Sequence, residues 1–359
     1  MFVYLQQNQL YIWFNESSGG ISMKYAITGG AGFLGYNLCQ TLLKQGHEIL
    51  CIDDLSSGQS DHLKKLERYP QCRIIVHDVT NPIAFHADAI FHLACPASPV
   101  IYQKDPVRTA RTNFIGTLNM LELSRKEDIP MLLTSTSEVY GEPDEHPQRE
   151  SYWGHVNPVG VRSCYDEGKR IAETLMMDYS RMYGVKSKIV RIFNTYGPYM
   201  SPDDGRVVSN FIVQSLSGRD ITISGDGTQT RSFCYVEDLV DGLIRMMRNP
   251  AVSGPVNLGN PNEITIMELA ELILELTGST SRIQHIPLPS DDPTHRKPDI
   301  TLAEQLLDWQ PSTQLADGLA ATIRRNRNPP PGFLSSIAGF SAECPEIYVQ
   351  GSLAELAGV

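Results

Sequence analysis

The stretch TGGAGFLG, residues 28–35, restricts the fold of this chain more than any other sequence feature. A short apolar run, KYAIT, precedes it, and a run with helical spacing, FLGYNLCQTLLKQG, continues from it. Gly30, Gly32 and Gly35 fit the spacing G-x-G-x-x-G, while Gly29, Gly32 and Gly35 fit G-x-x-G-x-x-G. Glycines in a strand-to-helix turn let a pyrophosphate approach the helix N-terminus, where free amide groups and the helix dipole favour anions. The context therefore predicts a dinucleotide site rather than a purely structural turn.

A carboxylate closes the second expected strand, EILCIDD. Asp53 lies 18 residues after Gly35 (53 − 35). An acidic residue there can accept hydrogen bonds from both ribose hydroxyls and would repel a 2′-phosphate. The following stretch, DDLSSGQSD, contains no Arg that could bind such a phosphate. The sequence therefore predicts NAD as the cofactor in preference to NADP.

Short apolar runs alternate with helical patterns through the first half of the chain. Strands are expected at KYAIT, EILCIDD, RIIVHDV, AIFHLA, MLLTSTS and KIVRIFN, and one helical pattern extends from Asp105 through Lys126. This alternation implies parallel pairing with helices on both faces of the sheet. We therefore expect an α/β fold, a Rossmann-type doubly wound parallel sheet with a smaller C-terminal α/β substrate-binding lobe over the carboxyl ends of the strands. The expected divisions are 1–22 as an N-terminal extension, 23–197 as the NAD-binding domain, 198–327 as the lobe and 328–359 as a flexible tail.

Composition limits the classes of partner. The net charge of −11 argues against nucleic acid, which needs a basic footprint. The first 22 residues contain no Lys or Arg, and their apolar clusters, MFVYL and LYIWF, are too short to span a bilayer or to act as a secretory signal. Seven Cys without paired or CxxC spacing predict reduced thiols and a cytoplasmic protein. No metal-binding pattern is present, and His92 and His155 are interpreted as structural.

The run RSCYDEGKR places Tyr165 four residues before Lys169, so the two are neighbours on one helix face. Taken alone, the run is typical of a solvated helix face. An ammonium beside a phenol can instead stabilise the phenolate, which would let the tyrosine take a proton from an alcohol. The stretch TSTSEVYG offers Thr136, Ser137 and Glu138 at the end of a strand, on the same side of the sheet as the glycine loop. A strand-end hydroxyl, a Tyr and a Lys form a known proton-handling trio.

Together, the glycine motif, TSTSEVYG and YDEGK resemble the extended short-chain dehydrogenase/reductase superfamily. Longer runs are similar to the UDP-glucuronate decarboxylases, also called UDP-xylose synthases; they include HLACPASPVIY, TNFIGTLNML, STSEVYG, YWGHVNP, RIFNTYGP, GDGTQTRSF and RKPDI. The resemblance extends from about Lys24 to Arg324. It implies oxidation of C4 of the sugar by NAD, loss of CO₂ from the resulting β-keto acid, and return of the hydride to give UDP-xylose. It also implies UDP-glucuronate as the substrate of the lobe, and a homodimer paired through helices such as the one with Tyr165.

By that resemblance, Thr136 positions the C4 oxygen, Tyr165 is the general base and Lys169 is its partner. Ser137 and Glu138 lie near the sugar ring, and Arg296 reaches the substrate from the lobe. The residues expected to contact NAD are Gly29, Gly32, Phe33, Leu34, Asp53, Asp54, Gly58, Asp78, Val79, Leu93, Thr112, Tyr165, Lys169 and Thr195. Those expected near the substrate are Asn194, Arg206, Arg231 and Arg296.

Three departures from the resemblance concern affinity more than reaction type. Tyr199 stands where relatives commonly carry Arg, Cys95 often reads Ser, and SSG replaces a bulkier stretch after Asp54. Other nucleotide-sugar reactions remain as alternatives: 4-epimerisation, 4,6-dehydration and oxidative decarboxylation. A non-catalytic NAD-binding regulator is the alternative from a different class. The pair Ser137–Glu138, where dehydratases carry Asp-Glu, disfavours dehydration.

Overall fold

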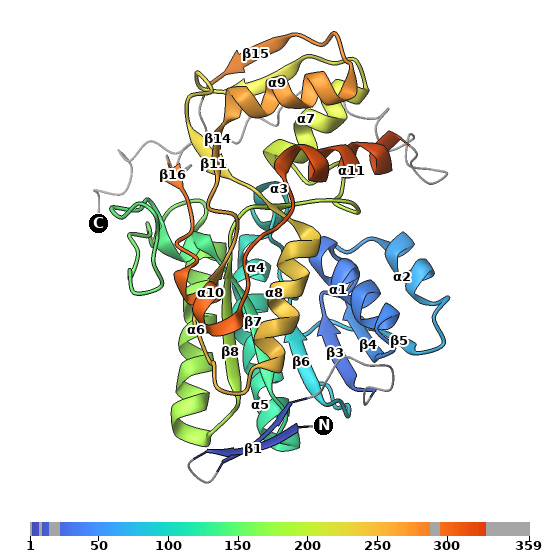
Figure 1. Cartoon of the computed structure of the whole chain (residues 1–359), viewed down its shortest axis with the longest axis vertical. Helices are drawn as coiled ribbons and strands as arrows, with labels where there is room; N and C mark the ends of the chain where they lie inside the picture. Colours follow the sequence, from blue (N-terminus) through green and yellow to red (C-terminus); the bar gives the residue numbers. More distant parts are fainter. Residues whose placement is uncertain (1, 7–8, 14–21, 288–294, 328–359) are drawn as a thin grey trace, which may run out of the picture.

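The computed structural model describes residues 2–6, 9–13, 22–287 and 295–327. A larger body is built around a parallel sheet, and a smaller lobe lies beyond the carboxyl ends of its strands (Figure 1). The tail expected at 328–359 lies outside the described residues. The α/β class expected from the sequence is confirmed.

The central sheet has seven strands, and every neighbouring pair is parallel. Six of them are the strands expected from the sequence, and the seventh, β13, was not expected. The order places early strands on one side of β3 and later strands on the other, so the connections diverge between β3 and β6. Ligands of such sheets bind at the carboxyl ends beside this divergence. Across the sheet, the strands are β5 (Cys72–Val76), β4 (Glu48–Asp53), β3 (Lys24–Thr28), β6 (Ala89–His92), β7 (Met131–Thr136), β8 (Ser187–Ile192) and β13 (Val256–Leu258).

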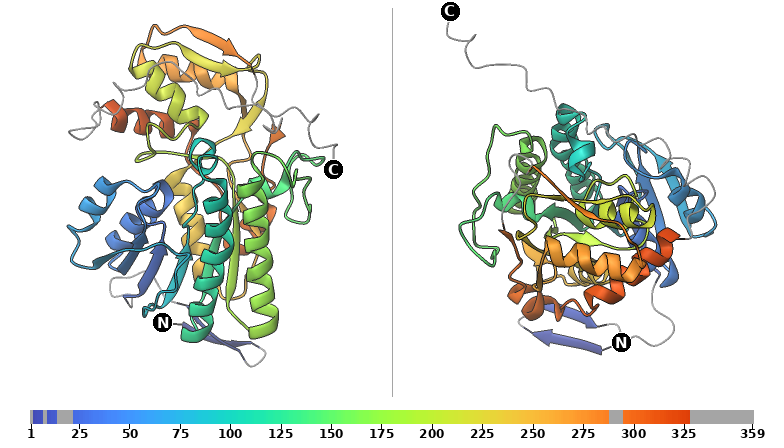
Figure 2. Two further views of the ribbon diagram at one scale, coloured as in Figure 1. Left: turned by 180° about the vertical axis from the view of Figure 1, so that it is seen from behind. Right: turned by 90° about the horizontal axis from the view of Figure 1, so that it is seen from above.

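Helices cover both faces of the sheet (Figure 2). Successive strand side chains point to opposite faces. Tyr25 and Ile27 therefore join one apolar core and Ala26 joins another. The first core also contains side chains of α1 (Phe33–Lys44), α2 (Ser60–Leu66), α8 (Val236–Arg248) and α10 (Thr301–Leu307). The second contains side chains of α5 (Thr117–Glu127) and α6 (Ser163–Tyr183).

The single helical pattern expected over 105–126 is interrupted. It consists of α4 (Pro106–Arg111), a π-helical turn η1 (Thr112–Gly116) and α5. The Thr112 hydroxyl donates to the Arg108 carbonyl oxygen at 2.9 Å, and the Asn113 amide donates to the Thr109 carbonyl oxygen at 3.1 Å. Side-chain bonds to carbonyls four residues earlier compete with the regular backbone ladder and bend helices, which accounts for the change of pitch.

The smaller lobe has its own apolar core. Its helices are α7 (Val207–Leu216), α9 (Ile266–Thr277) and α11 (Leu315–Arg327). Its strands are β10 (Ile221–Ser224), β15 (Ile283–Ile286), β11 (Thr230–Ser232), β14 (Glu263–Thr265) and β16 (His295–Arg296). A capping box between Thr265 and Glu268 starts α9.

Residues 198–327, assigned to the lobe from the sequence, contribute to both bodies. The chain leaves the sheet after β8, and α8, β13 and α10 then return to it. The parallel pair β9 (Thr195–Tyr196) and β12 (Cys234–Tyr235) lies where the chain passes between the two bodies. The lobe is therefore an insertion between elements of the sheet layer as well as a C-terminal addition.

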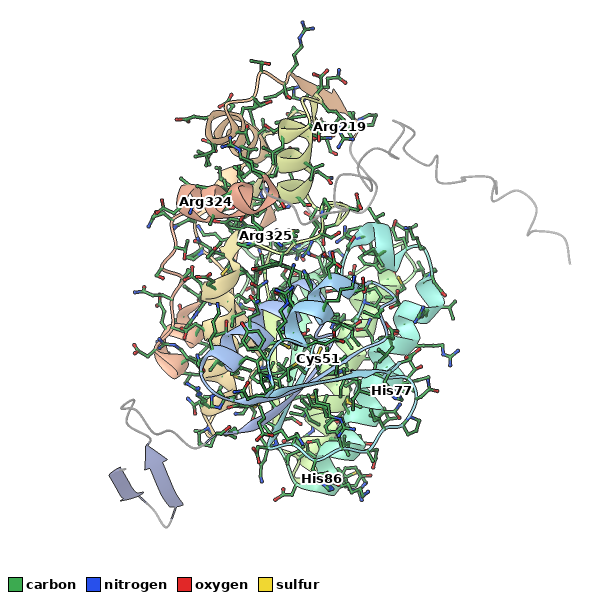
Figure 3. All side chains as sticks on the ribbon, turned by 90° about the vertical axis from the view of Figure 1, so that its right-hand side faces the viewer. Cys51, His77, His86, Arg219, Arg324 and Arg325 are labelled. Carbon is green, nitrogen blue, oxygen red and sulfur yellow. The ribbon has the colours of Figure 1, made fainter. Side chains whose placement is uncertain are left out.

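Residues 1–22, expected as an extension, include a β-hairpin. Its strands β1 (Phe2–Gln6) and β2 (Gln9–Trp13) pair only with each other, as an antiparallel sheet of their own. Figure 3 shows the hairpin standing apart from the sheet and the lobe. Within the described ranges, none of the helices combines the length and hydropathy that crossing a bilayer requires.

A largely buried ion pair fastens α6 to the sheet. The Arg191 guanidinium on β8 donates from Nε to Glu173 Oε1 at 2.9 Å and from Nη2 to Oε2 at 2.8 Å. The Ser135 hydroxyl on β7 donates to the same carboxylate at 2.6 Å. The side chains of Arg191 and Glu173 are 12% and 13% exposed. This pair fixes the helix that carries Tyr165 against the strand that ends at Thr136.

Breaking this pair tests its role. We expect Glu173→Gln to lower the free energy of unfolding by about 3–5 kcal/mol, because the Arg191 charge is left buried without its partner. The matched control is Asp178→Asn, which breaks the exposed Arg181–Asp178 pair on the same helix and should cost less than about 1 kcal/mol. Urea unfolding of both variants gives the comparison, and equal losses would contradict the assignment.

Candidate active site

A cavity of about 560 Å³ lies at the carboxyl ends of the sheet strands and extends under the lobe. Every predicted site residue lines it except Gly58 and Asp78. The lining comes from the glycine loop, the ends of β4, β6 and β7, α6, and the lobe strands β11 and β16. The fold thus brings together residues that are as far apart in the sequence as Gly29 and Arg296.

In the glycine loop, backbone segments lie so close to one another that side chains would not fit between them. A Cβ atom at position 35 would lie 2.1 Å from the Gly29 carbonyl oxygen, and Gly29 itself has a φ of +72°. The helix α1 starts directly after Gly32, which provides no side-chain cap, and the first turn of this fully described helix contains no acidic residue. Its first amide groups are therefore available to an anion. Gly32, Phe33 and Leu34 line the cavity here, and the loop fits the diphosphate of NAD.

Asp53 connects two loops at the adenosine end of the expected cofactor site. Its Oδ2 accepts a hydrogen bond from the Ala31 N–H at 3.0 Å, and its Oδ1 accepts from the Leu55 N–H at 2.8 Å. A Cβ atom at Gly58 would lie 2.5 Å from Asp53 Oδ1. Gly58 therefore serves the site from outside the cavity, because its lack of a side chain lets the 55–59 loop approach the carboxylate.

His62, which the sequence analysis did not select, supports the glycine loop from behind. Its Nδ1 lies 2.9 Å from the Ala31 carbonyl oxygen. Burial lowers the pKa of His62 to about 4, so the ring is neutral and Nδ1 carries the hydrogen that it donates. The imidazole stacks on Tyr36 with ring centroids 4.1 Å apart.

Arg108 was also missed, because it lies far in the sequence from the acidic residues it contacts. Its Nη2 lies 2.7 Å from Asp54 Oδ2 and 3.8 Å from Asp78 Oδ2. The pKa of Asp78 is lowered overall. Burial alone would raise this pKa, but hydrogen bonds from Thr80 and the charge of Arg108 outweigh that effect. Asp78 is not part of the cavity lining, and its carboxylate is paired with the Arg108 guanidinium beside the cavity.

Four further predicted cofactor residues, Val79, Leu93, Thr112 and Thr195, also line the cavity. Val79 and Leu93 contribute apolar surface. The hydroxyl of Thr112 donates to the Arg108 carbonyl oxygen and that of Thr195 donates to the Phe193 carbonyl oxygen, both at 2.9 Å. Both threonines therefore have donors already engaged by the backbone.

Tyr165 and Lys169 are buried, with 6% and 4% of their surface exposed. This excludes the solvated helix face that the sequence run alone suggested. Lys169 Nζ lies 5.9 Å from the centre of the Tyr165 ring and donates to the Thr134 carbonyl oxygen at 2.9 Å. The side chains of Tyr165 and Thr136 share a hydrogen bond. The strand end and the helix therefore present a hydroxyl, a phenol and an ammonium together.

The pKa of Tyr165 moves in the direction opposite to the one expected from the sequence. Burial is the largest cause that raises the pKa of Tyr165, and the charge of Cys95 is the next. The hydrogen bond with Thr136 lowers this pKa, but by less than the other two causes raise it. Burial likewise lowers the pKa of Lys169. Both shifts have one cause, since desolvation disfavours the charged form of each group. In the protein alone the phenol is therefore protonated.

Glu138 is surrounded by two guanidinium groups. Arg162 Nη2 lies 2.5 Å from Glu138 Oε2 and Arg296 Nη2 lies 3.4 Å from the same oxygen. Arg296 also donates from Nη1 to the Ser137 carbonyl oxygen at 2.8 Å. Burial raises the pKa of Glu138, but Arg296 and Arg162 outweigh burial and hold it below its usual value, so Glu138 is ionised.

The substrate residues predicted on the lobe side also face the cavity. Arg206 forms a bidentate ion pair with Asp204, with Nη2 2.8 Å from Oδ2. Arg231 donates from Nη1 to the Thr230 carbonyl oxygen at 2.9 Å, and Asn194 accepts from the Cys234 N–H at 2.8 Å through its backbone. Two guanidinium groups in the lining of the cavity suit an anionic ligand.

The departures noted in the sequence occupy defined places. Cys95 lines the cavity beside Tyr165 and Lys169. Tyr199 packs on Tyr36 with ring centroids 4.7 Å apart, and the Arg325 guanidinium of α11 lies 4.9 Å above its ring. Figure 3 shows Arg325 where the lobe meets the larger body. Tyr199 therefore helps to join the two bodies.

Sequence reasoning missed Arg162 and Asp204 as well as Arg108. Arg162 had a detectable signal, because it precedes Asp166 by four residues and so lies on the same helix face. Asp204 had none, since its pairing with Arg206 depends on a loop conformation. Within the described ranges, no group of three or more His, Cys, Asp or Glu side chains is placed to hold a metal ion.

The fold and this cavity define a class of protein. Residues 25–259 match the model of the NAD dependent epimerase/dehydratase family, and the chain belongs to that family. Among solved structures, it is similar to UDP-glucose 4-epimerase from Thermotoga maritima in complex with UDP-glucose, with 30% identity, a TM-score of 0.78, and coverage of 85% of this chain and 99% of the other. It is also similar to UDP-glucuronic acid 4-epimerase from Bacillus cereus in complex with UDP-glucuronic acid and NAD, with 26% identity, a TM-score of 0.76 and the same coverage.

Greater sequence identity is found within one group of this family. The chain is 54% identical to UDP-glucuronic acid decarboxylase 5 of Arabidopsis thaliana over 299 residues, which are 83% of this chain and 87% of that protein. It is 51% identical to UDP-glucuronic acid decarboxylase 1 of Danio rerio over 298 residues, which are 83% of this chain and 71% of that protein. The resemblance to this group inferred from the sequence motifs is confirmed.

Two glycines allow a test of the cofactor loop. We expect Gly32→Ala to keep the stability of the protein but to weaken NAD binding by about tenfold or more, ~1.4 kcal/mol. The reason is that the new methyl group meets only the Gly29 carbonyl oxygen, at 3.2 Å, while the residue lines the cavity. Gly35→Ala, whose Cβ would overlap the Gly29 backbone, should in addition destabilise the protein by about 1–3 kcal/mol. NAD titration and thermal melts separate the effects, and full affinity in Gly32→Ala would contradict the placement.

Proposed function

We propose that this protein converts UDP-glucuronate to UDP-xylose and CO₂ without net oxidation or reduction. The observation that carries the proposal is the meeting of Thr136, Tyr165 and Lys169 with the Glu138–Arg296 pair in one cavity, next to the glycine loop. The identity of 54% with a UDP-glucuronic acid decarboxylase supports it. Bound at the glycine loop, NAD would supply the hydride acceptor for C4 and later the hydride donor.

The residues of the chain then have separate tasks. Thr136 orients the C4 hydroxyl group, and Tyr165 takes its proton as C4 becomes a ketone. The ammonium of Lys169 stabilises the phenolate that forms only during this step, since the resting phenol is protonated. The carboxylate on C5 is now β to a ketone, so its C–C electron pair can pass into an enolate as CO₂ leaves. Protonation of the enolate at C5 restores the C4 ketone, and Tyr165 returns its proton to the C4 oxygen as C4 is reduced again to the alcohol.

Charge around the sugar explains why this site suits a substrate with a carboxylate. Arg296 and Arg162 approach from opposite elements, β16 and α6, and Glu138 balances part of their charge. Arg206, Arg231 and Asn194 lie at the lobe side, where we place the diphosphate and the uridine. Ser137 contributes its backbone carbonyl to hold Arg296. Charge-assisted bonds of this kind fix the orientation of an anion.

Product analysis tests the proposal. Incubation of the protein and NAD with UDP-glucuronate should yield UDP-xylose and CO₂ in equal amounts, and no NADH should accumulate. UDP-glucose, which lacks the carboxylate, serves as the control and should release no CO₂. UDP-galacturonate as product would indicate an epimerase instead, and stoichiometric NADH with a 4-keto pentose would indicate an oxidative decarboxylase.

Substitution of the proposed base gives a second test. Tyr165→Phe should lower kcat by about 10²–10⁴-fold, the usual contribution of general acid–base catalysis, while its thermal melt stays near that of the wild type. Lys169→Ala should slow turnover and also weaken NAD binding. The readout is single-turnover NADH absorbance with UDP-glucuronate. A Tyr165→Phe variant with the wild-type rate would refute the assignment.

The assembly and location are further parts of the proposal. We propose a cytoplasmic homodimer that contacts neither nucleic acid nor membrane. Exposed apolar side chains on α4, η1 and α6 support the dimer; they are Val107, Phe114, Ile171, Met182 and Tyr183. The six cysteines of the described ranges are unpaired thiols, which suits a reducing compartment.

A further inference from the structure

Arg296 reaches the cavity from a short strand of the lobe, yet its guanidinium group contacts residues of the larger body. The side chain is 2% exposed, and its Nη1 donates to the Ser137 carbonyl oxygen at 2.8 Å. Its Nη2 lies 3.4 Å from Glu138 Oε2. The strand β16 has only two residues, which pair with β11. Because so short a strand forms few backbone hydrogen bonds, contacts from outside the strand have to hold Arg296 in place.

The peptide group between Arg296 and Lys297 is held at both of its polar atoms. Its carbonyl oxygen, which belongs to Arg296, accepts a hydrogen bond from the Ser232 hydroxyl on β11 at 3.2 Å. Its N–H, which belongs to Lys297, donates to Oε1 of Gln148 at 2.9 Å. Gln148 lies in the loop 141–162 of the larger body, beside β16 (Figure 1). A peptide group is planar, so these two bonds fix the direction in which the chain leaves Arg296.

Gln148 is itself held by both its side chain and its backbone, and it is fully buried. Its Nε2 donates to the Glu145 carbonyl oxygen at 2.7 Å. Its backbone N–H donates to the Lys297 carbonyl oxygen, and its own carbonyl oxygen accepts from the Asp299 N–H, both at 2.9 Å. The reversed amide would set Nε2 against the Lys297 N–H, donor against donor. The side chain therefore has one orientation, with Oε1 toward the peptide group after Arg296.

A second buried amide connects this loop with the sheet. Asn257 of β13 is fully buried, and its Nδ2 donates to the Gln148 carbonyl oxygen at 3.0 Å. Its Oδ1 accepts from the Tyr140 hydroxyl at 2.7 Å. Tyr140 ends the turn η2 (Ser137–Tyr140), which also carries both partners of the Arg296 guanidinium group. A chain of hydrogen bonds therefore links the backbone beside Arg296 with the turn that its side chain contacts.

We propose that Gln148 is a positioning residue, which aims the Arg296 guanidinium group at the carboxylate of the substrate by holding the Lys297 N–H. In the decarboxylation proposed above, on which this inference rests, that carboxylate is the group that leaves as CO₂. A guanidinium group can bind a carboxylate through two parallel hydrogen bonds, and a small displacement breaks this geometry. Gln148 does not line the cavity, so its effect on the substrate passes through Arg296.

The test replaces Gln148 by Met, which keeps the length of the side chain and removes both hydrogen bonds of its amide. The matched control is Lys188→Met, which puts the same side chain at another buried polar position. Lys188 is 4% exposed and donates to the Val252 carbonyl oxygen at 2.8 Å. It lies near the start of β8, whose other end, Ile192, lines the cavity. Thermal melts of both variants measure how far each substitution lowers Tm.

The readout compares UDP-glucuronate with UDP-xylose, which lacks the carboxylate. In Gln148→Met, KM for UDP-glucuronate should rise by about tenfold or more, while the inhibition constant of UDP-xylose stays within about twofold of the wild type. Lys188→Met should change neither constant, even if its Tm falls as far. A purely structural role of Gln148 would lower Tm and leave the ratio of the two constants at its wild-type value.

Gln148→Glu separates the hydrogen bonds from the packing and keeps the inference testable if Gln148→Met fails to fold. A protonated carboxyl group has the shape of the amide and can both accept from the Lys297 N–H and donate to the Glu145 carbonyl oxygen, whereas an ionised carboxylate can only accept. KM for UDP-glucuronate, divided by the wild-type KM at the same pH, should therefore be close to unity at low pH. This ratio should rise with pH through the pKa of the introduced carboxyl group, which burial raises. The charged groups on the segments packed around position 148 are Glu145, Arg149 and Glu150 in the loop, Lys297 and Asp299 after β16, and Arg191 on β8.

Unchanged discrimination between UDP-glucuronate and UDP-xylose in Gln148→Met would overturn the inference, while decarboxylation by the wild type stands. A KM ratio in Gln148→Glu that does not vary with pH would overturn it as well. A wild type that releases no CO₂ from UDP-glucuronate would overturn the proposed function, and this inference with it.

Discussion

The buried guanidinium of Arg296 is the contact on which the arrangement of the site depends. It is 2% exposed, comes from a lobe strand, and donates to the Ser137 carbonyl oxygen at the end of the sheet. Together with Arg162 it keeps Glu138 ionised. The negative charge of Glu138 is in turn one of the causes that raise the pKa of Asp166. One residue of the lobe thus lines the cavity and influences the pKa values of two acids.

Burial is the second general influence, and it disfavours the charged form of the titratable groups in and beside the cavity. It raises the pKa values of Tyr165 and Asp166 and lowers that of Lys169. Only where opposite charges are close, as around Glu138, does the ionised form win. Two neighbouring carboxyl groups, Glu138 and Asp166, therefore have pKa values shifted in opposite directions, an arrangement that enzymes use to separate acid from base roles.

The polypeptide chain passes between the two bodies of the molecule more than once. The chain leaves the sheet after β8, returns with α8 and β13, and leaves again before α10 returns. The largely buried Arg191–Glu173 pair holds α6 in the larger body. Near the glycine loop, Tyr199 packs on Tyr36, and Arg325 of the lobe lies over its ring. Residues from both bodies therefore line one cavity.

The sequence by itself determined the six main strands, the glycine loop, the NAD preference and part of the cavity lining, because these depend on local periodicity, glycine geometry and recognisable motifs. The short strand β13 and the π-helical turn η1 could not be predicted, since they depend on a neighbouring strand and on side-chain bonds within a helix. The partners Arg108, Arg162 and Asp204 were decided by the tertiary structure, as was the raised pKa of Asp166. The physical reason is that burial and the approach of distant charges set these properties, and neither is encoded in the spacing of residues along the chain.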